Sequence, residues 1–172
     1  MDEKEYRSAY DDINPLRCVF EKAINSRICN CSRAIRFNLA DREGVSCQDD
    51  MAQKNCVNLL SLLRDNGRFL LQQTTIEGQL PHNAEIKIQN GGIQGLLSVV
   101  SIRTTTMPSE HAVSSKHPKD TSSNTLPNEH DIAGLVTAAV QQYQSLEQLP
   151  YSDIMQAVSA FQTRRKKRKK TQ

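Results

Sequence analysis

The stretch that should decide the fold is "RICNCSRAIRFNLADREGVSCQDDMAQKNC", residues 27–56, because it holds four of the five cysteines of the chain. The fifth, Cys18, lies shortly before it in "NPLRCVFEKAI", and no cysteine follows Cys56 in this chain of 172 residues. In a reducing compartment, clustered cysteines are more often metal ligands or redox groups than disulfides. The confinement of the thiols therefore predicts that they share one role.

The thiols predict one metal or cluster centre. The expected cofactor-binding set is Cys18, Cys29, Cys31, Cys47 and Cys56, and the expected metal ligands are Cys18, Cys31, Cys47 and Cys56. Thiolates are the soft ligands that hold zinc or the iron of a cluster such as 4Fe–4S. The set has no CxxC pair and no nearby histidine, so it favours an Fe–S cluster slightly over zinc. Two other interpretations stay open: inert buried thiols, which pack as small hydrophobes, and a thiol–disulfide role.

Hydrophobic periodicity predicts a mainly α-helical fold around this stretch. Residues 14–25 show helical spacing with Cys18 on the polar face, and residues 33–44 suggest a second, short helix. A longer helix is expected from Asp49 or Asp50 to Asn66, with Cys56 on its apolar face and Gly67 as its stop. Residues 84–93, "AEIKIQNGGI", alternate and contain an Asn-Gly pair, which predicts a small β-hairpin rather than a phosphate-binding loop.

Composition divides the chain into five parts. We expect a flexible polar leader (1–12), a cysteine-rich metal- or cluster-binding domain (13–102), a disordered linker rich in Ser, Thr and Pro (103–128), an amphipathic helical segment (129–163) and a basic tail (164–172). The helical segment is too small to fold alone, so it should dock on the body or on a protein partner through residues 131–161.

The tail is the strongest electrostatic feature. Its seven adjacent cations are the expected polyanion-binding residues: Arg164, Arg165, Lys166, Lys167, Arg168, Lys169 and Lys170. Subtracting these seven charges from the formal net charge of +3 leaves −4 for the rest of the chain. Such a tail suits non-specific contact with nucleic acid or with an anionic membrane surface, and it equally suits a solubilising end.

No catalytic constellation is recognisable, so the sequence favours a protein that is not an enzyme. It shows no transmembrane run and no secretory signal, which predicts a cytoplasmic protein. The favoured function is a small Fe–S- or zinc-binding accessory protein in redox chemistry, electron transfer or assembly. The alternatives are a nucleic-acid-associated factor with structural zinc and a metal-free interaction adaptor.

Overall fold

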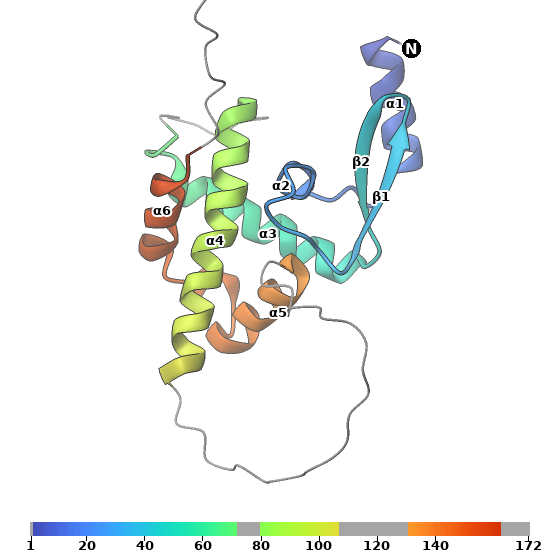
Figure 1. Ribbon diagram of the computed structural model, residues 1–172. Helices are drawn as coiled ribbons and strands as arrows, with labels where there is room; N and C mark the ends of the chain where they lie inside the picture. The colour runs from blue at the N-terminus through green and yellow to red at the C-terminus, as the bar shows by residue number, and fades with distance from the viewer. Residues whose placement is uncertain (1, 72–79, 107–130, 163–172) are drawn as a thin grey trace, which may run out of the picture.

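The computed structural model describes residues 2–71, 80–106 and 131–162 (Figure 1). The elements in chain order are α1 (Glu3–Ile13), α2 (Glu21–Asn25), β1 (Ala34–Leu39), β2 (Arg42–Cys47), α3 (Asp50–Gly67), α4 (His82–Thr106), α5 (Ile132–Tyr143), the 3₁₀ helix η1 (Leu146–Gln148) and α6 (Tyr151–Ala160). The expectation of a mainly helical protein with one antiparallel hairpin is confirmed for these residues. None of the described helices is both long and apolar enough to span a bilayer.

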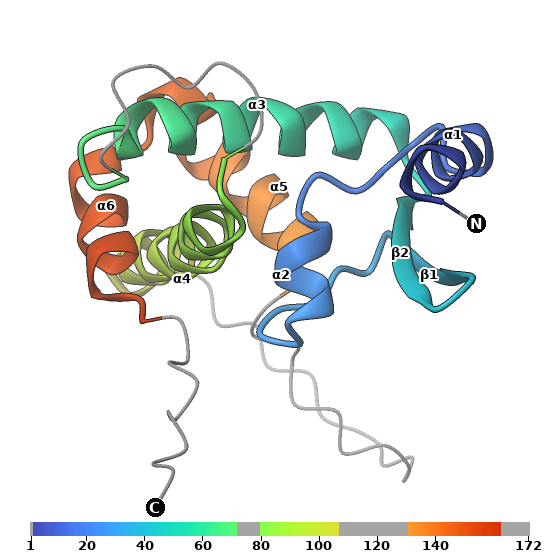
Figure 2. The same cartoon turned by 90° about the horizontal axis from the view of Figure 1, so that it is seen from above.

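The helices form one body, and the hairpin lies beside it with α1 (Figures 1 and 2). α4 runs through the centre of the body with α6 along its side, and α3 extends from this helical body to the hairpin. Viewed from above, α2 lies between α4 and the hairpin, next to α5. α2 is therefore the element that connects the two parts on the side opposite α3.

The hairpin does exist, but the sequence placed it wrongly. It is formed by β1 and β2, with Ala34 opposite Cys47 and Leu39 opposite Arg42, where a short helix was expected. The segment "AIRFNL" alternates apolar and polar residues, and this period of two suits a strand. Residues 16–18 pair with β2 as well: the Cys18 N–H donates to the Val45 carbonyl at 3.0 Å. The helix expected from residue 14 is consequently shortened to α2.

Residues 84–93 are not a hairpin but part of α4. Gly91 in this stretch faces α6, and a Cβ there would lie 2.6 Å from the Val158 Cα atom, whereas Gly92 faces Leu63 of α3. A Cβ at Gly95 would lie 2.8 Å from the Ile154 Cα atom. The absence of side chains thus lets two helices approach closely, and this packing outweighs the low helix propensity of glycine.

The expected helix at residues 49–66 matches α3, and the expected helical character of residues 129–163 matches α5 and α6. α3 begins after its N-cap Asp49, whose side chain accepts from the Ala52 N–H, and it ends at Gly67. The apolar residues of the C-terminal segment are buried against α3 and α4, so this segment docks on the body: Ile132, Leu135, Val136, Ala139, Leu146, Leu149, Ile154 and Val158.

Two of the expected irregular parts overlap helices of the structure. The expected flexible leader contains α1, which a capping box stabilises: Asp2 accepts from the Glu5 N–H at 2.8 Å, and Glu5 accepts from the Asp2 N–H at 3.0 Å. The expected linker begins within α4, and its remainder lies outside the described residues, as does the basic tail.

The glycine contact between α4 and α6 generates a stability prediction. Gly95→Ala should lower the free energy of unfolding by about 1–3 kcal/mol, because the new methyl group meets the backbone of Ile154 and forces the helices apart. This loss should appear although alanine favours a helix by about 1 kcal/mol over glycine. The measurement is urea unfolding. Ser98→Ala, on the exposed side of the same helix, is the control and should change stability by no more than about 0.5 kcal/mol.

Candidate functional site

Four of the five thiols line one small cavity. Its walls include Cys18, Cys31, Cys47 and Cys56, which come from the segment paired with β2, the loop before β1, the end of β2 and the buried face of α3. The cavity measures about 10 Å³, which is about the space of one water molecule. Its other lining residues include Phe20 and Ile132. Cys29 does not line it and lies buried near Asn90, with 4.0 Å between the Sγ and Oδ1 atoms.

The predicted cofactor, an Fe–S cluster or zinc, is wrong. Among the residues that the structure describes, no group of His, Cys, Asp or Glu side chains is arranged to hold a metal ion. The thiols instead act as parts of an apolar wall, and the space that they share is far too small for a cluster of four iron atoms. The Cys47 thiol donates to the Asp49 carbonyl at 3.3 Å.

Burial keeps these thiols protonated. It raises the pKa of Cys18, Cys29 and Cys56 from 9.0 to about 12, and it raises the pKa of Cys31 as well. Repulsion from the neighbouring thiolates adds to the pKa shifts of Cys18 and Cys56. A protonated thiol is a weak nucleophile and a weak ligand. The geometry therefore favours the interpretation of packed, inert thiols that the sequence had left open.

The raised pKa of Cys56 predicts a loss of stability in alkali. An unfolded chain releases this proton near pH 9, whereas the folded chain holds it until about pH 12. The contribution of this thiol is complete below pH 9 and falls as pH rises toward 12, by up to about 1.4 kcal/mol per pH unit.

Cys56→Ala should therefore flatten the fall of the free energy of unfolding between pH 9 and 10.5. Urea unfolding of the variant and the parent over this pH range measures the difference. Parallel curves for the two proteins would show that the Cys56 proton is not held by the fold.

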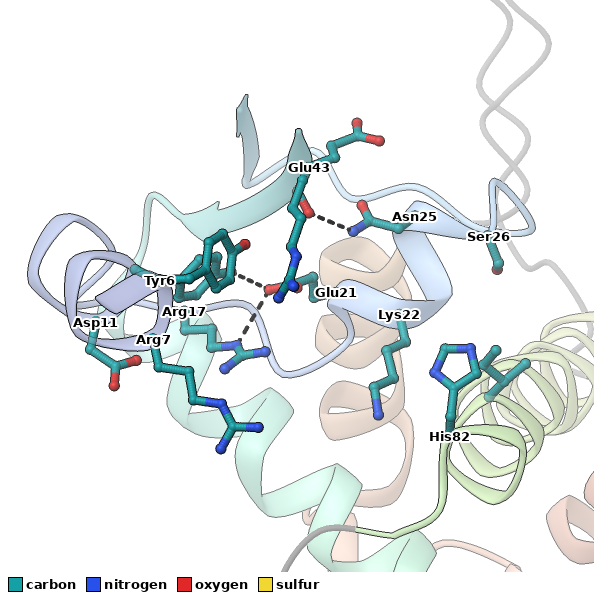
Figure 3. Close-up of a pocket in the computed structure, with 13 residues that line it drawn as sticks. Tyr6, Arg7, Asp11, Arg17, Glu21, Lys22, Asn25, Ser26, Glu43 and His82 are labelled. Carbon is teal, nitrogen blue, oxygen red and sulfur yellow. Dashed lines mark hydrogen bonds and ion pairs between the residues drawn. The ribbon is translucent and has the colours of Figure 1, made fainter. Parts of the chain in front are cut away.

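A second and much larger cavity lies between α1, α2, β2 and the start of α4 (Figure 3). Its volume is about 820 Å³, within the range of roughly 300–1,000 Å³ that is usual for small-molecule sites. Its lining residues are Tyr6, Arg7, Tyr10, Asp11, Arg17, Glu21, Lys22, Asn25, Ser26, Arg42, Glu43, His82 and Ile86. We call it the polar cavity, because Ile86 is the one lining residue whose side chain is wholly apolar.

One wall of the polar cavity is a network around Glu21. The Tyr10 hydroxyl donates to the Glu21 carboxylate, and the Arg17 Nε atom lies 3.3 Å from the same group. The Arg17 guanidinium also covers the Tyr10 ring, 4.8 Å from its centroid. Burial and the neighbouring Glu21 raise the pKa of Tyr10 to about 12, so its phenol stays neutral. The charge of Glu21 is thus already balanced, while the orientation of Arg17 is fixed.

The opposite wall is held by Gln89 on α4. Its side-chain oxygen accepts from the Ala23 N–H at 3.0 Å, and its nitrogen donates to the Val19 carbonyl at 3.0 Å and to Glu85 at 2.7 Å. Glu85 is buried and forms an ion pair of 2.7 Å with Arg64 of α3. This buried polar network fixes α2 against α4, and it therefore sets the position from which Lys22 enters the cavity.

The electrostatic balance of the polar cavity favours an anion. Four Arg or Lys residues line it against three carboxylates. Arg17 balances Glu21, and Glu43 is paired at 2.8 Å with Arg36, which is not a lining residue. Lys22 forms no ion pair with any residue that the structure describes. Figure 3 shows the Lys22 side chain between those of Arg17 and His82 along the rim of the same space.

Sequence reasoning missed this site. None of the lining residues was expected from the sequence to bind a ligand. The one local signal is "YRSAY", residues 6–10, in which Tyr6 and Tyr10 are four residues apart and share a helix face. The other walls come from segments far apart in the chain, and only the fold brings them together.

Comparison with known proteins adds no functional assignment. No family model matches this chain, and neither a curated protein nor a solved structure is found to match it. The geometry of its cavities is therefore the main indication of what the protein does.

Proposed function

We propose that the protein is a non-catalytic binding protein that holds a small anionic ligand in the polar cavity. The observation that supports this proposal most is the unpaired charge of Lys22 in a cavity where two of the three lining carboxylates, Glu21 and Glu43, already have cationic partners. The third, Asp11, lies on the α1 side of the cavity, away from Lys22 (Figure 3). A ligand anion would complete the electrostatics of the site. Partial exclusion of water from the cavity would strengthen the attraction relative to an open surface.

The proposal keeps the accessory role expected from the sequence but not its metal. The two other expected contacts, a protein partner at residues 131–161 and a polyanion at the basic tail, stay proposals. The apolar residues of the first segment pack inside the protein, so a partner there would have to use the exposed side of α5 or α6. The tail lies outside the described residues.

Removal of the Lys22 charge tests the proposed function. Lys22→Met keeps most of the side-chain stem, and it should weaken binding of a small dianion about tenfold, as expected for the loss of one close charge pair in a partly desolvated site. Isothermal titration calorimetry at physiological salt measures the change. Lys54→Met is the matched control, because Lys54 lies exposed on α3, outside the cavity and paired with Asp50.

An equal loss of affinity in both variants would show that the anion responds only to the net charge of the protein. The proposed site would then be wrong. A loss confined to Lys22→Met would support it.

A further inference from the structure

The shape and chemistry of the polar cavity point to one class of anion. We propose that it binds a phosphate monoester whose body carries hydroxyl groups, such as a phosphorylated sugar or polyol. This inference rests on the proposed function, since it names the ligand of the same site.

The donors suit phosphate better than carboxylate. A phosphate monoester carries between about −1.5 and −2 charges at pH 7 and presents three terminal oxygens, whereas a carboxylate carries one charge and two oxygens. The Arg17 guanidinium is held by the ion pair of its Nε atom with Glu21 and by its contact with the Tyr10 ring. Its two terminal nitrogens remain available to donate together to one phosphate, in a fixed orientation. Lys22 adds an ammonium group, and His82, which also lines the cavity, adds a ring nitrogen. These groups could approach the terminal oxygens of one phosphate from different directions.

The size of the cavity favours a ligand that is larger than inorganic phosphate. A space of about 820 Å³ suits a ligand with a substantial body. Away from the cations, the lining consists mostly of hydrogen-bonding residues, such as Asn25 and Ser26. Ile86 is the one lining residue with a wholly apolar side chain. A body with hydroxyl groups would find donors and acceptors here, whereas an alkyl chain would leave these groups without partners.

The tyrosines argue against an aromatic body. The Arg17 guanidinium lies 4.8 Å from the centroid of the Tyr10 ring, and the Arg42 guanidinium lies 4.4 Å from that of Tyr6. Each of these rings already has a cation over one face, and the two rings lie 5.9 Å apart in a tilted arrangement. Stacking of a base or another planar group on those faces would require that the guanidinium groups leave.

The test is a panel of ligands on the full chain, measured by calorimetry at physiological salt. The probes are ribose 5-phosphate, ribose, inorganic phosphate, succinate and phenyl phosphate. We expect ribose 5-phosphate to bind at least tenfold more tightly than each of the other four. Arg17→Lys, which keeps the charge but loses the fork, should weaken its binding about tenfold, as should Lys22→Met.

The outcomes separate the two proposals. Binding of succinate as tight as that of ribose 5-phosphate would overturn the phosphate class but leave the anion site intact. Preference for phenyl phosphate would overturn the hydroxylated body. No binding of any anion would overturn both proposals. Binding of ribose 5-phosphate that is unchanged in both variants would place it outside the cavity, for example on the basic tail, and would also overturn both.

Discussion

The side-chain amide of Gln89 is the contact on which the arrangement of this protein most depends. α2 has only five residues, too few to be stable by themselves. The amide supplies hydrogen bonds that so short a helix lacks, because it bonds to the backbone of Val19 and of Ala23 at the same time. Beside it, Asn90 is fully buried next to Ser26 and Cys29. Two consecutive polar residues of α4 thus hold the turn of chain that separates the hairpin from the helical body.

The same segment of α4 serves two purposes. Gln89 and Asn90 face α2, and the next residue, Gly91, meets α6. A buried polar network is costly unless it is fully bonded, and here the Gln89 amide has partners at both ends. The network is not complete, since Glu85 Oε2 and Arg64 Nε have no partner in the described part of the chain. The network fixes the position of α2 relative to α4. This relative position determines the shape of the polar cavity.

Local signals in the sequence were enough for part of this fold. Asp49 and Gly67 mark the ends of α3, and the spacing of Ile132, Val136 and Ala139 reveals the buried face of α5. The Asn90-Gly91 pair predicted a turn wrongly, because the turn signal is local whereas its helical state depends on contact with α6, more than 60 residues later.

The prediction of a metal centre at the thiols was wrong for a related reason. The thiols were expected to converge on one centre, but whether a group of cysteines forms a ligand set or a packed wall depends on side-chain directions that spacing does not determine. The polar cavity was beyond prediction, since Lys22, Arg42 and His82 share no local pattern.

The central claim is that the polar cavity, and not the basic tail, is where this protein binds an anion. It is tested most directly by the amide shifts of the ¹⁵N-labelled full chain during a titration with ribose 5-phosphate. We expect shifts concentrated at residue 17 and at residues 21–26, 42–43 and 82–86, which line the polar cavity around Lys22. Shifts confined to residues 163–172, or spread evenly over the lysine and arginine residues of the chain, would contradict the claim that the anion binds in the polar cavity.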